Sequence, residues 1–236
     1  MRKHGISMKV KAVEINRMTS KAIILGASGL IGGQLLDQLL QHPSYSDVLI
    51  LVRKKLTVEH PKLRQLVVNF DDLTSYSSEI NGNVVFCCIG TTKSKTPDQT
   101  EYRKIDYQYP LDLARIAQAN GAESYHLVSA IGADATSSIF YTKTKGEVER
   151  DLKTIPFKSI YIYQPSLLVG DRKEKRLMEK IMAKVMGLIN PLLSGSLKKY
   201  RSIHVKNVAK AMLHESLTGK RGTFIYTSDQ IQVLSL

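Results

Sequence analysis

Tyr141 and Lys145 stand four residues apart, so a helix over this stretch places both side chains on one face. A lysine ammonium beside a phenol stabilises the phenolate and lowers the pKa of the tyrosine from about 10. Such a tyrosine can exchange a proton with the oxygen of a carbonyl or an alcohol. Because the chain has 11 tyrosines and 23 lysines in 236 residues, a tyrosine four positions before a lysine is expected by chance about once. The surrounding sequence must therefore decide what the pair means.

Ser129 supplies part of that context. It follows the apolar run 124–128, which is typical of a strand, and it precedes Tyr141 by twelve positions. The carboxyl end of a parallel strand faces the crevice where α/β sheets bind ligands. There the Ser129 hydroxyl could hold a substrate oxygen and stabilise the charge that develops on it. Taken singly, the three residues also fit a turn serine, a core tyrosine and a solvated lysine. Together they predict a catalytic set.

A glycine-rich turn lies upstream. Residues 26–32 read Gly-Ala-Ser-Gly-Leu-Ile-Gly, between the apolar run 22–25 and an apolar-periodic stretch. A strand, a glycine turn and a helix in this order are typical of a dinucleotide site, where bare backbone and a helix N-terminus approach a pyrophosphate. We therefore expect cofactor contacts from Gly26, Ser28, Gly29, Leu30, Ile31 and Gly32.

The end of the second expected strand distinguishes the two pyridine nucleotides. An acidic residue there bonds the ribose 2′-hydroxyl of NAD, whereas an arginine accommodates the 2′-phosphate of NADP. Arg53 and Lys54 directly follow the run 48–52, and a guanidinium fork matches a phosphate. The sequence thus favours NADP(H) over NAD(H). Positions after the next two expected strands add Asp71, which could bond the adenine amino group, and the cleft-lining Cys88, Ile89, Gly90 and Thr91.

Apolar runs alternate with amphipathic stretches along the whole chain. Expected strands span residues 21–25, 48–52, 65–70, 84–89, 124–128, 159–163 and a segment near 223–226, and expected helices span 31–41, 102–120, 141–153, 172–187 and 207–216. This alternation predicts an α/β fold, a Rossmann-type doubly wound parallel sheet with helices on both faces. We expect residues 1–20 to form a basic extension, residues 21–236 to form one domain, and residues 171–200 to form a small C-terminal cap over the cleft.

Composition limits the other function classes. The net charge of +13 suits anionic ligands or surfaces. No aromatic interleaving or known binding module accompanies the lysines, so no specific nucleic-acid partner is expected. The six histidines lack metal-ligand spacing, and we expect no metal site. Adjacent Cys87 and Cys88 suit a reducing compartment, and no apolar run predicts a membrane span or a secretory signal. We therefore expect a cytoplasmic protein, either a monomer or a homodimer.

Three further stretches carry a family resemblance, together with the glycine turn, Ser129 and the Tyr141–Lys145 spacing. They are residues 86–92 (FCCIGTT), 132–134 (GAD) and 145–149 (KGEVE). On these the chain resembles the atypical short-chain dehydrogenases/reductases, in particular the Tat-interacting oxidoreductase-like subgroup. The resemblance implies NADPH binding, a serine–tyrosine–lysine catalytic set, and a nicotinamide contact from backbone between Pro165 and Leu168. Gln164 stands where relatives often carry an arginine, and Ala130-Ile131 stand where they carry a second serine and a basic residue.

The expected function is NADPH-dependent reduction of a small-molecule carbonyl. Tyr141 would donate the proton, Lys145 would hold the ribose and tune Tyr141, and Ser129 would orient the oxygen. The alternative is an NADPH-binding regulatory or interaction protein with little catalysis, which the resemblance also allows. Its contact surface would be the expected amphipathic helix around residues 172–189.

Overall fold

The computed structural model describes residues 19–170 and 193–236. Its centre is a parallel sheet of seven strands in the order β3-β2-β1-β4-β5-β6-β9. The strands are β1 (Ser20–Leu25), β2 (Tyr45–Val52), β3 (Leu63–Val67), β4 (Val84–Cys87), β5 (Ser124–Val128), β6 (Ser159–Gln164) and β9 (Gly222–Thr227). The strand order reverses between β1 and β4, so a crevice opens outside the carboxyl ends of these strands. The expected doubly wound sheet is confirmed.

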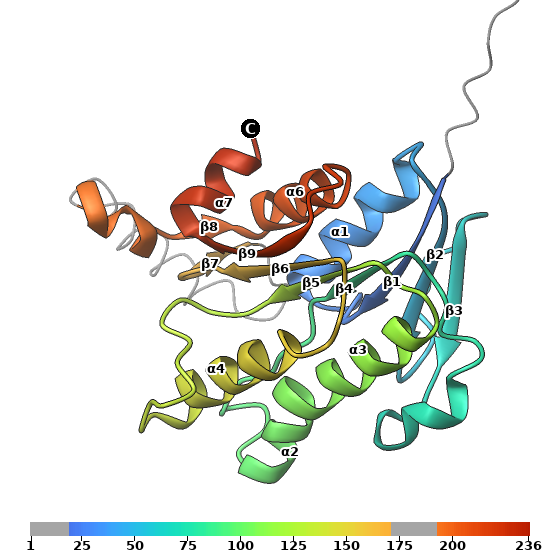
Figure 1. The fold of residues 1–236 in the computed structure, drawn as a ribbon, viewed down its shortest axis with the longest axis horizontal. Coiled ribbons are helices and arrows are strands. Elements are labelled where there is room, and N and C mark those ends of the chain that lie inside the picture. The colour runs from blue at the N-terminus through green and yellow to red at the C-terminus, as the bar shows by residue number, and fades with distance from the viewer. Residues whose placement is uncertain (1–18, 171–192) are drawn as a thin grey trace, which may run out of the picture.

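Helices cover both faces of the sheet (Figure 1). One face carries α1 (Leu30–Gln41), α6 (Val205–Ser216) and α7 (Ser228–Leu234), and the other carries α3 (Tyr109–Ala119) and α4 (Phe140–Leu152). Strand β1 therefore buries side chains in two cores. Ala22 and Ile24 belong to one core, and Ile23 and Leu25 to the other. Burial on both sides explains why the central strands are unbroken apolar runs in the sequence.

The expected helix 102–120 consists of three segments. They are α2 (Gln99–Arg103), a π-helical turn η2 (Lys104–Gln108) and α3. Pro110 lacks the N–H that would bond the carbonyl of Asp106 in a regular α-helix, and the wide turn directly precedes it. In this turn the Asp106 side chain is buried. Single π turns occur frequently at functional sites, and Asp106 lies in the site described below.

Other boundaries differ from the sequence expectation. Strand β3 ends at Val67 and not at residue 70, because the Asn69 side chain accepts the N–H of Asp71 and starts a 3-10 helix, η1 (Phe70–Tyr76). A short parallel pair was not expected, β7 (Leu168–Val169) with β8 (Ile203–His204), and neither was α7. Within the expected cap the structure describes a 3-10 helix, η4 (Gly195–Tyr200). The expected helix 172–187 and most of the expected extension lie outside the described residues.

A row of packed aromatic rings crosses the sheet and includes a buried histidine. The His126 ring centroid lies 4.8 Å from that of Phe86 and 4.4 Å from that of Tyr161. Its Nδ1 lies 3.1 Å from the Tyr163 hydroxyl, and its Nε2 has no partner among the described residues. Burial lowers the pKa of the His126 imidazole from 6.5 to about 3. The ring is therefore neutral in the folded protein at any physiological pH.

This histidine predicts a loss of stability in mild acid. Above pH 6.5 the imidazole is mostly neutral in the folded and in the unfolded protein. Below pH 6.5 the imidazole takes up a proton in the unfolded protein but stays neutral in the folded protein. The free energy of unfolding then falls by about 1.4 kcal/mol per pH unit, or about 2 kcal/mol at pH 5. Urea unfolding at pH 7 and pH 5 should show this loss in the wild type and a correspondingly smaller one in His126→Phe. Equal losses in the two proteins would contradict the assignment.

Candidate active site

The chain turns sharply where β1 ends. Gly26 has a φ of +91°, a region that favours glycine. A Cβ at Gly26 would lie 2.6 Å from the backbone nitrogen of Ile89, and one at Gly32 would lie 2.2 Å from the Gly26 carbonyl oxygen. The Gly29 N–H donates to that same oxygen over 3.0 Å. The first and third glycines of the turn are therefore required by the packing of the turn itself.

Helix α1 starts at this turn with its first N–H groups open. Gly29 occupies the N-cap position, and no side chain caps the helix. The first-turn residues Leu30, Ile31 and Gly32 therefore offer backbone N–H groups at the positive end of the helix dipole. Bare glycine backbone and an uncapped helix start fit the pyrophosphate of a dinucleotide.

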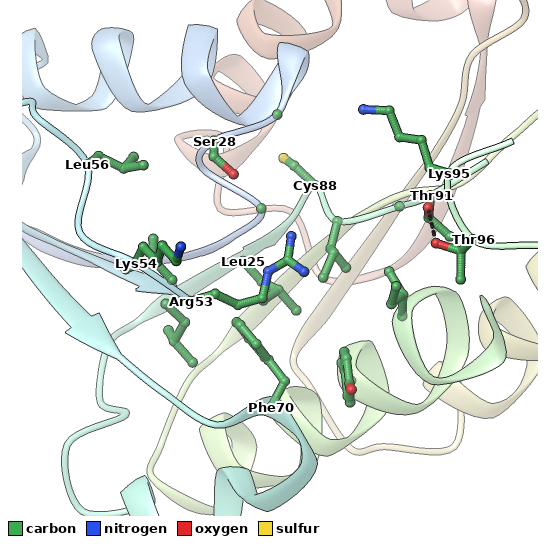
Figure 2. A pocket seen from close by; sticks show the side chains of 18 of the residues that line it. Leu25, Ser28, Arg53, Lys54, Leu56, Phe70, Cys88, Thr91, Lys95 and Thr96 are labelled. Carbon is green, nitrogen blue, oxygen red and sulfur yellow. Dashed lines mark hydrogen bonds between the residues drawn. The ribbon is translucent and has the colours of Figure 1, made fainter. Parts of the chain in front are cut away.

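A cleft of about 780 Å³ lies in front of the turn, at the carboxyl ends of β1, β2 and β4. Figure 2 shows the Arg53 side chain extending into it from the end of β2, with Ser28 and Cys88 on one side and Phe70 on the other. Lys95 and Thr96, from the loop after β4, also line it, and sequence reasoning missed them. The sequence-predicted residues that line the cleft are Gly26, Ser28, Gly29, Arg53, Lys54, Cys88, Ile89, Gly90 and Thr91.

Three predicted contacts have other neighbours in the structure. The Asp71 carboxylate accepts the Tyr109 hydroxyl over 2.9 Å and lies 3.3 Å from the Lys104 ammonium. Tyr109 lines the cleft and Asp71 does not, so Asp71 orients a wall of the cleft. The Pro165 carbonyl accepts the Ile131 N–H over 3.0 Å, and Leu168 pairs with β8. Neither of these two residues lines the described cleft.

Lys145 lies behind the cleft wall, tied to an aspartate. Its Nζ is 2.7 Å from Oδ1 of Asp106, and both side chains are buried. The second oxygen of Asp106 accepts the Thr91 N–H over 2.8 Å. A Cβ on Gly90 would lie 3.7 Å from the Lys145 Nζ, so this glycine leaves the ammonium next to the cleft. Asp106 thus fixes both the lysine and the loop after β4.

Sequence reasoning missed Asp106, although the sequence carried a signal. Asp106 follows buried Tyr102 by four positions and precedes buried Leu113 by seven. It therefore falls on the apolar face of the expected helix 102–120, where a carboxylate needs a buried partner. The buried Lys145 ammonium is that partner.

The Asp106–Lys145 ion pair changes what Tyr141 experiences. Burial raises the pKa of the Tyr141 phenol, the Lys145 ammonium lowers it, and Asp106 raises it again. The net shift is upward and not downward as the sequence predicted. Burial is the largest single influence on the pKa of Lys145 and lowers it, but the charge of Asp106, the neighbouring Tyr141 and the hydrogen bond to Asp106 together outweigh burial, and the pKa is raised. At neutral pH the site therefore holds a protonated phenol beside a charged but compensated lysine.

Ser129 has a different partner from the one predicted. Its buried hydroxyl donates to Glu149, whose two carboxylate oxygens also accept the Gln164 side-chain amide over 3.0 Å each. Burial raises the pKa of the Glu149 carboxyl. Glu149 lies eight residues after Tyr141 on α4, about two helical turns away. The structure thus brings Ser129 together with Glu149 and Gln164, and Tyr141 together with Lys145 and Asp106.

A second pocket of about 520 Å³ has Tyr141 in its wall. It shares Thr91 and Thr96 with the dinucleotide-sized cleft. The hydroxyls of these two threonines lie 2.8 Å apart and hydrogen bond to each other, as the dashed line in Figure 2 marks. The second pocket therefore adjoins the cleft at these two threonines, and Tyr141 lines the second pocket but not the cleft.

The described ranges contain neither a cluster of metal ligands nor a helix that could span a membrane. No group of three or more His, Cys, Asp or Glu residues there could hold a metal ion. None of the helices within 19–170 and 193–236 is long and apolar enough to cross a membrane.

Curated relatives align over most of the chain. Protein HTATIP2 of Rattus norvegicus is 34% identical over 218 residues, which cover 90% of this chain and 88% of the relative. Protein FMP52 of Candida albicans, named mitochondrial, is 29% identical over 204 residues, which cover 84% and 89%. Further FMP52 proteins of Aspergillus clavatus and Coccidioides immitis are also named mitochondrial. The subgroup resemblance is confirmed, and the expectation of a cytoplasmic location is contradicted by these names.

Solved structures share the fold at low identity. A UDP-glucose 4-epimerase from Thermotoga maritima with UDP-glucose superposes with a TM-score of 0.65 at 14% identity, covering 91% of this chain and 81% of the epimerase. MoeE5 in complex with UDP-glucose and NAD gives a TM-score of 0.65 at 15% identity, covering 91% and 80%. At this level of identity the likeness establishes the arrangement of strands and helices alone.

A family model covers nearly the whole described chain. The NAD dependent epimerase/dehydratase family matches residues 22–233, a range that contains the glycine turn, the cleft and the Tyr141–Lys145 pair. The architecture of the cleft agrees with this match, because its glycine turn and open helix start fit a dinucleotide. The chain therefore belongs to the NAD dependent epimerase/dehydratase family.

Proposed function

We propose that this chain is an NADPH-dependent reductase of a small-molecule carbonyl. Family membership supports NAD(P)-dependent oxidoreductase chemistry at the coarser level. The observation that carries the finer proposal is the position of Tyr141. It lines a pocket that shares Thr91 and Thr96 with the cleft, one helical turn before Lys145. A carbonyl compound in the pocket would therefore lie between the phenol and a nicotinamide in the cleft.

Each residue of the site has a distinct role in this proposal. When bound, a reduced nicotinamide supplies a hydride. Tyr141 donates the proton to the carbonyl oxygen, and its raised pKa keeps that proton in place at neutral pH. Lys145 has three N–H donors, and Asp106 takes one of them. The Lys145 Nζ lies beside Gly90 in the cleft wall, where its remaining donors can hold ribose hydroxyls.

Ser129 takes no part in proton donation in this proposal. A serine hydroxyl has a single proton, and that of Ser129 is donated to Glu149. The hydroxyl instead joins the end of β5 to α4, next to Gln164. Tyr141 is therefore the proton donor, and Ser129 supports the helix that carries it.

The basic pair after β2 favours NADPH over NADH. Arg53 and Lys54 line the cleft, and both have exposed side chains that can reach a 2′-phosphate. We expect Arg53→Ala to weaken NADPH binding about 10- to 100-fold, because a charge-assisted hydrogen bond to phosphate contributes about 1.5–3 kcal/mol. NADH lacks the phosphate, so its affinity should change little. Isothermal titration calorimetry with both nucleotides measures the two effects.

Arg221→Ala is the matched control. Arg221 is also exposed, but it does not line the cleft, so it reports the effect of removing one positive charge from a basic protein. Equal losses of NADPH affinity in the two variants would show that Arg53 contributes only its positive charge to the whole protein and makes no specific contact with the 2′-phosphate. An equal loss of NADH and NADPH affinity in Arg53→Ala would place the arginine elsewhere on the nucleotide.

The reductase proposal is tested by following the oxidation of NADPH with a panel of aldehydes and ketones. Turnover by the wild type that requires NADPH supports it. Tight NADPH binding without turnover of any compound would refute the reductase and favour the regulatory alternative. The contact surface expected for that alternative, residues 172–189, lies outside the described residues.

A further inference from the structure

The pocket beside Tyr141 has a mainly apolar wall. Pro97, Tyr102, Ile139, Phe140 and Tyr141 contribute rings and aliphatic groups. The Tyr102 and Phe140 rings pack edge to face with centroids 5.4 Å apart, and the Tyr102 hydroxyl donates to the Thr91 carbonyl over 3.2 Å. The ring of Tyr102 is thus held in place with its polar end satisfied, which leaves apolar surface toward the pocket.

Ile139 is the least expected residue of this wall. It is 63% exposed and occupies the N-cap position of α4, where it offers no side-chain hydrogen bond. Serine, threonine, aspartate and asparagine are the favoured N-cap residues, and an isoleucine there forgoes a hydrogen bond to the helix start. An exposed isoleucine therefore stabilises neither the helix nor the core. A residue that breaks a local rule in this way often serves a binding site.

The polar side chains of the lining are those of Thr91, Thr92, Lys93, Thr96 and Gln99, and only Thr91 and Thr96 also line the cleft. Thr91 and Thr96 carry the hydroxyls of the edge shared with the cleft, and the backbone of Thr91 is fixed by Asp106. Lys93 is the one charged residue among the described residues that line the pocket. A nucleoside diphosphate sugar carries two negative phosphates and many hydroxyls, whereas this pocket offers a single ammonium for the phosphates and an apolar wall of three rings, a proline and an isoleucine for the rest of the molecule.

We propose that this pocket binds the apolar body of the substrate, an aldehyde or ketone built on an aromatic ring system and lacking phosphate and sugar groups. The inference rests on the proposed reductase function, because Tyr141 must reach the carbonyl oxygen. The ring system packs against Ile139, Phe140 and Tyr102, and the carbonyl lies at the threonine edge. A volume of about 520 Å³ falls within the range of small-molecule sites.

The test uses Ile139→Asp with 2-naphthaldehyde as substrate and 2-naphthalenemethanol as a binding probe that NADPH cannot reduce. Aspartate is a favoured N-cap residue, so this variant should fold at least as well as the wild type. The charge should nevertheless weaken binding of the naphthyl alcohol about 10-fold or more, because an apolar contact becomes a desolvated carboxylate. Calorimetry measures this binding in the presence of NADPH, and thermal unfolding checks the fold.

Val233→Asp is the matched control, because Val233 is 67% exposed on α7 and lines neither pocket. It should bind the naphthyl alcohol as the wild type does, and both variants should keep wild-type NADPH affinity. Equal affinity of Ile139→Asp and the wild type for the naphthyl alcohol would overturn the inference. So would failure of the wild type to bind that alcohol while it binds UDP-glucose.

The two proposals fail in different ways. Selective loss of naphthyl binding in Ile139→Asp, without NADPH oxidation by any aldehyde, would support the pocket and refute the reductase. Conversely, turnover of 2-naphthaldehyde with the same KM in Ile139→Asp as in the wild type would support the reductase and refute the pocket.

Discussion

Tyr141→Phe should lose turnover by about 10²- to 10⁴-fold, the usual contribution of a positioned proton donor. The variant keeps the ring that lines the second pocket and removes only the hydroxyl. NADPH binding should be unchanged, because the glycine turn and the Arg53–Lys54 pair line the cleft and Tyr141 does not. The rate of NADPH oxidation with an accepted aldehyde and the calorimetric affinity for NADPH measure the two halves of the prediction.

Tyr102→Phe is the control for this experiment. Tyr102 lines the same pocket, but its hydroxyl is bonded to the Thr91 carbonyl. Its removal should leave turnover largely intact. If both variants keep wild-type turnover, Tyr141 is not the proton donor. Because the pKa of Tyr141 is raised, the rate of reduction in the wild type should not fall until the pH is alkaline and the phenol ionises.

Asp106→Asn should have the largest effect on stability. The variant leaves the buried Lys145 ammonium without its counter-ion, a loss that costs about 3 kcal/mol or more in the free energy of unfolding. The asparagine oxygen can still accept the Thr91 N–H, so the loop after β4 keeps that bond. Urea unfolding at neutral pH measures the loss. Asp112→Asn is the control on α3, where a partly exposed pair with Arg115 contributes at most about 1 kcal/mol.

The same variant should lower the pKa of Tyr141. Asp106 raises that pKa and Lys145 lowers it, so removing the carboxylate leaves the ammonium unopposed. The phenolate absorbance of Tyr141 is isolated by subtracting the titration of Tyr141→Phe from that of the wild type, and likewise in the Asp106→Asn background. An unchanged or raised pKa of Tyr141 would show that Asp106 does not compensate Lys145.

Much of the fold could be predicted from the sequence, because the strands and the glycine turn require particular residue types at particular positions. The central strands are visible because burial on both faces demands continuous apolar residues, as in β1 and β2. The glycine turn is visible because Gly26 and Gly32 admit no Cβ. Helix α7 was missed although Thr227 and Gln230 form a capping box, a signal that a short sequence window does carry.

The site was harder to predict because its side chains form hydrogen bonds and ion pairs with residues that are distant in the sequence. Ser129 stands at the expected strand end, but its hydroxyl direction depends on Glu149, twenty positions later. Lys145 lies on the expected helix face, but its effect on Tyr141 depends on Asp106 in a π turn. No spacing rule encodes such pairs, since they depend on how α4 packs against the end of β5 and against the π turn. The sequence could therefore place these residues near a cleft but not state their protonation or partners.

Calorimetric titration of the whole chain with NADPH and with NADH tests the central claim most directly. That claim is that the turn at residues 26–32 and the basic pair after β2 hold a pyridine dinucleotide phosphate. We expect one site per chain, with NADPH bound about 10- to 100-fold more tightly than NADH. Absence of binding for both nucleotides would contradict the whole account of the cleft, and tighter binding of NADH would contradict the role given to Arg53.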